Sequence, residues 1–143
     1  MNKIAILAQM GAGSPIVFGA SEYGVPLLSW LTGQFYTDYR ARIFDESNQD
    51  WLPKWPCREF ARSFACFAQE AWAKTPGTPD GETSVLVGEY WFKPDASRGM
   101  PVDEGHAVCF ALTDQGLVYI DPQNGTLWQM SDTERDSNYF RRL

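Results

Sequence analysis

The longest regular pattern of apolar positions lies between residues 56 and 74. Apolar or small residues recur there every three or four positions, at Cys57, Phe60, Ala61, Phe64, Ala65, Phe67, Ala68, Ala71 and Trp72. This spacing predicts an amphipathic helix with one buried stripe. Pro56 suits the first turn, because the amide hydrogen that proline lacks has no helical partner there. The run of proline and glycine in residues 75–81 then ends the helix.

After this helix the pattern changes to short apolar runs that are separated by polar turns. Strands are predicted at residues 84–92, 106–112, 117–121 and 126–130. The turn signal at 113–116 joins the second and third of these strands as a β-hairpin. Ser131 and Glu134 have the spacing of a capping box that opens a short final helix. One helix followed by closely spaced strands predicts an α+β fold, with the helix packed across a small antiparallel sheet.

The first 25 residues are apolar and rich in glycine, without a clear period. Residues 11–15 lack the lysine of a phosphate-binding loop, so a turn is predicted there. Glycine, glutamine and proline interrupt the apolar run, which favours a mature, non-secreted N-terminus over a signal peptide. Residues 1–25 are a candidate arm that packs on a partner protein, and 25–31 are predicted to form a strand or one helical turn.

Length and composition bound the class of protein. The chain has 143 residues, the usual size of one domain, so residues 1–143 are predicted to form a single domain. Hydrophobic residues make up 44% and aromatic residues 15%, which is enough for a sizeable core. A net charge of −6 disfavours binding to nucleic acid, because phosphates would be repelled. No apolar stretch is long enough to cross a bilayer, so no membrane partner is expected.

The numbers and spacing of the cysteines and the single histidine limit which chemistry the chain can support. Three cysteines without dense spacing do not indicate a disulfide scaffold, which favours a reduced, cytoplasmic location. No C-x-x-C or H-x-x-x-H pair is present, so neither a zinc site nor any other metal or cofactor is expected.

Cys57 is the candidate nucleophile, because it stands at the predicted start of the helix. A helix N-terminus carries partial positive charge, which favours the thiolate form of cysteine. Cys57 also lies on the inward stripe, whereas Cys66, nine residues later, points roughly 180° away. The alternative is that Cys57 is an ordinary buried residue.

His106 is the candidate base, since a cysteine nucleophile requires a nearby imidazole that a third group orients. A tight hairpin that pairs Leu112 with Leu117 sets Val108 opposite Asp121. Alternate residues share a face of a strand, so Asp121 becomes a diagonal neighbour of His106 on the same face. The alternative is a surface histidine at a strand end and an aspartate that forms a turn before proline. Cys109 faces away from His106 on this strand.

Three short motifs in this order resemble a known family. Residues 55–61 (Trp-Pro-Cys-Arg-Glu-Phe-Ala), 105–107 (Gly-His-Ala) and 119–123 (Tyr-Ile-Asp-Pro-Gln) look like the C-x-[DE]-F-A, G-H-A and [DE]-P-Q signatures of a papain-like group. That group includes the C-terminal domain of the Marasmius oreades mushroom agglutinin and related phage proteins, and is more distantly similar to transglutaminase-like folds.

By this resemblance Cys57 is the nucleophile, His106 the base and Asp121 the orienting acid. Gln123 or Gln49 is then a candidate oxyanion donor. Arg58 replaces the first acid of the group's acidic pair, which puts the calcium requirement of the agglutinin in doubt for this chain.

Three hypotheses about function follow. The first is a cysteine hydrolase that cleaves a peptide or amide bond in a peptide or protein substrate with a Cys-His-Asp triad. The second is a catalytically silent papain-like module, structural or interacting, within a larger assembly such as a phage particle, which would make it virion-associated. The third, a small-molecule or sugar-binding domain, rests only on the six tryptophans.

Overall fold

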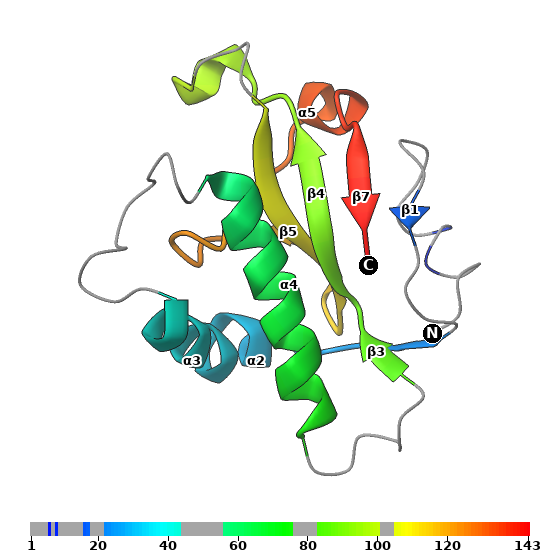
Figure 1. Cartoon of the computed structure of the whole chain (residues 1–143). Coiled ribbons are helices and arrows are strands. Elements are labelled where there is room, and N and C mark those ends of the chain that lie inside the picture. The colour runs from blue at the N-terminus through cyan, green and yellow to red at the C-terminus, as the bar shows by residue number, and fades with distance from the viewer. Residues whose placement is uncertain are drawn as a thin grey trace.

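The computed structural model describes residues 6, 8, 16–17, 22–43, 56–75, 83–100 and 105–143. Its elements, in chain order, are β1 (Ile16–Val17), β2 (Glu22–Gly24), α2 (Leu28–Thr32), α3 (Gln34–Ile43), α4 (Cys57–Ala73), β3 (Thr83–Val85), β4 (Val87–Phe92), the 3₁₀ turn η1 (Ala96–Arg98), β5 (His106–Thr113), β6 (Gly116–Ile120), α5 (Asp132–Asp136) and β7 (Phe140–Arg142). A five-stranded sheet has the order β1-β7-β4-β5-β6, and β2 pairs with β3 beside it. Figure 1 shows α4 lying across one face of the larger sheet, which confirms the predicted α+β fold.

Helix α4 is the predicted long helix, with boundaries one residue inside the predicted ones. Pro56 is its N-cap and Lys74 its C-cap. The apolar stripe turns Phe60, Ala61 and Phe64 into the core, where each is at most 1% exposed. The pattern of apolar positions thus placed the right face of the helix against the sheet.

The β5–β6 hairpin has the predicted register. Leu112 lies opposite Leu117, and Cys109 lies opposite Ile120. The turn closes with Gly116 at a φ of +95°, a conformation that glycine adopts without the steric cost of a Cβ. The predicted capping box is also confirmed, since Ser131 and Glu134 exchange both hydrogen bonds at the start of α5.

One strand prediction holds with a break at Leu86, and one was wrong. Residues 84–92 form two strands, because the chain leaves β2 and joins β5 at Leu86, whose amide N donates to the Gly24 carbonyl over 2.9 Å. Residues 126–130 do not form a strand but make one isolated bridge, between Ile120 and Leu127. Within 25–31 the helical alternative holds, as α2 begins at Leu28.

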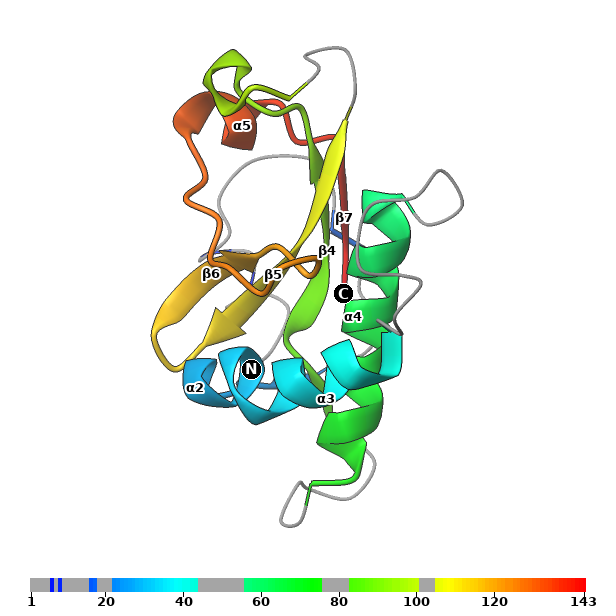
Figure 2. The same cartoon turned by 90° about the vertical axis from the view of Figure 1, so that its left-hand side faces the viewer.

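The buried side chains form two clusters, one on each face of the sheet. On β5 the small residues Ala107, Cys109 and Ala111 face α4, where the helix backbone comes close. The large residues Val108, Phe110 and Leu112 face the opposite side. Figure 2 shows α2 and α3 together near one end of the sheet, whereas α5 lies toward the other end, where α4 begins.

The described parts of the N-terminal segment pack on later parts of the chain. β1 pairs in parallel with β7, β2 pairs in parallel with β3, and Ile6 is fully buried in the core. These contacts are made within the chain and not with a partner. The remainder of residues 1–21 lies outside the described residues, so an arm that reaches a partner protein stays a prediction for it.

Candidate active site

Cys57 is the first residue of α4, and its side chain is partly exposed. Burial raises the pKa of its thiol, but hydrogen bonding and charge interaction with His106 lower it. The backbone N–H groups of Ala107 and Arg58 lower it further, so that the pKa lies below its ordinary value of 9.0. A larger fraction of this sulfur is therefore thiolate at neutral pH than for an ordinary cysteine.

His106 begins β5 and is only 4% exposed. Burial lowers the pKa of its imidazole, but the Asp121 carboxylate and the Cys57 sulfur raise it, with a net result of about 9. The imidazole Nε2 lies 3.8 Å from Asp121 Oδ2, an ion-pair distance. At neutral pH this imidazole is therefore mostly protonated and positively charged.

Asp121 follows β6 and is held by its own turn. Its Oδ1 accepts a hydrogen bond from the Gln123 backbone N over 2.9 Å, and its backbone N donates to the Thr126 carbonyl over 2.9 Å. Gly125 closes the turn at a φ of +74° and leaves no room for a side chain, because a Cβ there would lie 2.5 Å from the Tyr36 ring. The turn thus orients the carboxylate and packs closely on Tyr36 of α3.

The structure places His106 3.8 Å from Asp121, the diagonal neighbour that the hairpin register predicted, and within hydrogen-bonding reach of Cys57. The catalytic roles of the three residues stay predictions. The backbone N of Gln123 donates to Asp121 and so helps to orient it. In the described part of the chain, no hydrogen bond joins the Gln123 side chain to Cys57. Gln49, the other candidate oxyanion donor, lies outside the described residues. Oxyanion roles for both glutamines stay predictions.

Aromatic rings that the sequence analysis did not identify enclose the imidazole. The Trp128 ring lies 5.0 Å from the His106 ring, centre to centre, with 37° between the planes. The Phe92 ring meets the imidazole edge-on at 5.8 Å. These rings exclude water from the ion pair with Asp121, which strengthens the attraction between the two charges. Nothing in the local sequence around Trp128 signals this contact.

A buried carboxylate fixes Trp128 in place. Glu134 is 0% exposed, and its Oε2 accepts a hydrogen bond from Trp128 Nε1 over 3.2 Å. Arg98 donates to both Glu134 oxygens, over 3.0 and 2.8 Å, and its guanidinium lies 4.6 Å from the Trp128 ring centre. Burial raises the pKa of Glu134, but these donors with the backbone N–H groups of Ser131 and Asp95 lower it to about 2.

The other two cysteines are placed differently. Cys66 is exposed on the outer face of α4, as predicted. Cys109 is fully buried, its thiol donates to the Ala61 carbonyl over 3.1 Å, and burial raises its pKa well above the ordinary value. Cys57 alone among the three combines partial exposure with an imidazole neighbour.

The described residues offer neither a metal-binding cluster nor a membrane-spanning helix. No group of three or more histidine, cysteine or acidic side chains is close enough to hold a metal ion in the described part of the chain. Nor does any described helix have the length and apolar character of a membrane span.

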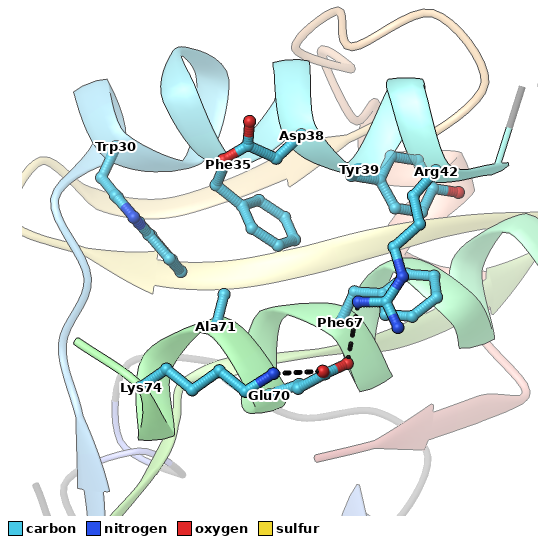
Figure 3. A pocket seen from close by; sticks show the side chains of 9 residues that line it. All are labelled: Trp30, Phe35, Asp38, Tyr39, Arg42, Phe67, Glu70, Ala71 and Lys74. Atoms are coloured by element: carbon cyan, nitrogen blue, oxygen red, sulfur yellow. Dashed lines mark hydrogen bonds and ion pairs between the residues drawn. The ribbon is translucent and has the colours of Figure 1, made fainter.

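A separate cavity of about 170 Å³ lies between α3 and α4 (Figure 3). Its aromatic walls and charged rim are formed by Trp30, Phe35, Asp38, Tyr39, Arg42, Phe67, Glu70, Ala71 and Lys74. Glu70 pairs with Arg42 at 3.0 Å and with Lys74 at 2.6 Å, so the facing charges neutralise each other. Cys57, His106 and Asp121 do not line this cavity.

Comparison with known proteins gives a likeness of fold. No family model matches the chain, and no curated protein matches its sequence. Among solved structures, a Polyporus squamosus lectin bound to the human-type influenza-binding epitope Neu5Aca2-6Galb1-4GlcNAc is similar, with a TM-score of 0.67 and 14% identity. The alignment covers 90% of this chain and 42% of the lectin chain.

A second similar structure is the complex of PSL1a, the same fungal lectin, with E64. Its TM-score is 0.68 at 14% identity, over 98% of this chain and 46% of the other. This chain therefore shares its fold with a part of these lectins and spans less than half of their length. Their fold is related to that of the Marasmius agglutinin, the group to which the sequence motifs pointed.

Proposed function

We propose that this chain is a papain-like cysteine hydrolase that cleaves a peptide or amide bond. The observation that carries the proposal is a partly exposed Cys57 at the start of α4 beside His106, whose Nε2 lies 3.8 Å from Asp121 Oδ2. The lowered pKa of Cys57 and the raised pKa of His106, about 9, agree with this arrangement. A thiolate next to an imidazolium is the combination that covalent catalysis by cysteine requires.

The proposed reaction proceeds in two stages. The Cys57 thiolate attacks the carbonyl carbon, and His106 gives its proton to the leaving amine as the C–N bond breaks. Water then attacks the resulting thioester while His106 takes a proton from it, and the carboxylic acid leaves as the sulfur is released. Asp121 holds the imidazole and stabilises its positive charge.

Reaction with E64, a peptide-like epoxide that thiolates open, tests this function without a known substrate. Intact mass and peptide mapping should show one adduct, on Cys57. Cys57→Ser and His106→Ala should abolish or strongly slow labelling, while the matched control Cys66→Ser should react as wild type does. If E64 labels no residue, or labels Cys66 first, the chain has no activated cysteine.

A second candidate function is a catalytically silent interaction module. The comparisons support it better than the first, because both similar structures come from a lectin and one is bound to a glycan. Since the shared fold covers less than half of either lectin chain, glycan binding by this chain is itself a proposal. Within this chain, the cavity of Figure 3 offers Trp30 for stacking and charged groups for hydrogen bonds.

Glycan-array binding of the whole chain would test this second function. Trp30→Ala should lose binding and Cys57→Ser should keep it. Binding that disappears only in Cys57→Ser would contradict the module hypothesis, because it would make the glycan a ligand of the cysteine site.

A further inference from the structure

Tyr139 lies beside the candidate active site, on the segment between α5 and β7. Its backbone N donates to the Trp91 carbonyl over 3.1 Å, and its ring meets the Trp91 ring edge-on at 6.3 Å. Trp91 is paired with Ala107 in the sheet, one residue after His106. Tyr139 is therefore fixed close to the start of β5, although it is 50% exposed.

The Tyr139 hydroxyl approaches the backbone next to the histidine closely. A Cβ at Gly105 would lie 2.0 Å from the hydroxyl oxygen and 3.1 Å from the ring carbon that carries it. This glycine is therefore required for space. Because Gly105 has no side chain, the Tyr139 hydroxyl can lie at the edge of the site.

This hydroxyl is protonated at neutral pH, since the ordinary pKa of tyrosine is 10.0 and the shift at Tyr139 is upward. Burial raises the pKa of Tyr139, and the negative charge of Cys57 raises it further. At neutral pH the group is thus a neutral hydrogen-bond donor that lies near the thiolate and is open to solvent.

We propose that Tyr139 is a substrate-positioning residue, whose hydroxyl donates a hydrogen bond to an amide carbonyl of a peptide-like substrate seated at Cys57. The proposal rests on the proposed hydrolase function. A tyrosine that serves only packing would need its ring against Trp91, and phenylalanine would replace it without effect. The hydroxyl itself is therefore the group to test.

The test compares two reagents on wild type and Tyr139→Phe. Iodoacetamide is small and reports the reactivity of the thiolate, so its rate with Cys57 and the pH dependence of that rate should stay within about twofold. E64 carries peptide-like amides, so its saturation constant should rise about five- to tenfold, as expected for one lost hydrogen bond, with little change in the maximal rate.

Gly105→Ala provides a second perturbation of the same hydroxyl. The added methyl group should displace it and weaken E64 binding to a similar degree. In the Tyr139→Phe background Gly105→Ala should then have little further effect on the saturation constant, since the displaced group is already gone.

Three outcomes overturn the proposal. An unchanged E64 saturation constant in Tyr139→Phe, with wild type labelled selectively at Cys57, removes the positioning role and leaves the hydrolase function standing. A shifted pH profile with iodoacetamide would mean that Tyr139 acts on the thiol instead of on the substrate. Wild type that reacts at Cys57 no faster than at Cys66 overturns both this role and the proposed function.

Discussion

Replacement of Glu134 by glutamine isolates the charge of the buried network behind the site. Glutamine is accepted at the third position of a capping box, so the start of α5 stays capped. What is lost is the negative charge, which faces Arg98, the Trp128 indole and the backbone amides. The variant therefore changes the electrostatics of the network with little change in its shape.

The magnitude follows from the pKa of Glu134. A fall from 4.5 to about 2 on folding corresponds to about 3 kcal/mol of stability when the carboxylate is ionised, at about 1.4 kcal/mol per tenfold change in proton affinity. Because the pKa is lowered in the folded state, this contribution is complete above about pH 4.5. It disappears as the pH falls through about 2.

Urea or guanidinium unfolding of both proteins between pH 7 and pH 2.5 would measure this contribution. Glu134→Gln should cost about 3 kcal/mol at pH 7, and the difference from wild type should shrink steadily below pH 4.5. Asp132→Asn in the same helix is the matched control, because its side chain is 91% exposed and its pairing with Arg135 should contribute less than about 1 kcal/mol. A cost that does not vary with pH, or one no larger than that of the control, would refute the reasoning.

Three further predictions concern the site. Iodoacetamide should label Cys57 before Cys66 and Cys109, as peptide mapping after brief exposure would show. His106→Ala should slow the labelling of Cys57 more than Asp121→Ala does, because the imidazole itself stabilises the thiolate. Equal labelling rates in the two variants would contradict this role of the imidazole. The labelling rate of Cys57 should stay high at neutral pH and decline only as the pH falls through its lowered pKa, whereas a rate that first rises near pH 9.0 would mean an ordinary thiol. Gly99→Ala should lower the stability by the roughly 1–2 kcal/mol of left-handed backbone strain, and Gly125→Ala by more, because only at Gly125 would the methyl group meet the Tyr36 ring. Thermal unfolding of the two variants measures both losses of stability, and equal losses would rule out an effect of the Tyr36 contact.

Much of the architecture could be predicted because its signals are local. The stripe of α4 repeats over many residues, and the turn at 113–116 sets the hairpin register that brings Asp121 to the face of His106. Helix α3 was missed, since its buried positions Phe35 and Tyr39 stand among polar residues without a strong stripe. The two-strand structure of 84–92 was missed because it arises from pairing with β2 and β5, which no local pattern encodes.

The candidate site was predictable only in part for the same reason. A cysteine at a helix start and a single histidine on a strand are visible in the sequence. The contacts of Trp128 with His106, and of Tyr139 with Gly105, join residues that are distant along the chain. Their geometry depends on how α5 and the segment that follows it pack on the sheet, and a motif of a few residues does not record that packing.

Because the thiol lies on a helix and the imidazole on a strand, partial unfolding can separate them. His106 and Asp121 are tied to one hairpin, whereas Cys57 is the first residue of α4 and reaches His106 from a different element. Fraying of that turn would carry the sulfur away from its proton partner while the sheet stays folded. The reactivity of Cys57 therefore reports whether the start of α4 is packed on the sheet. At mild denaturant concentrations this reactivity should fall before tryptophan fluorescence shows global unfolding.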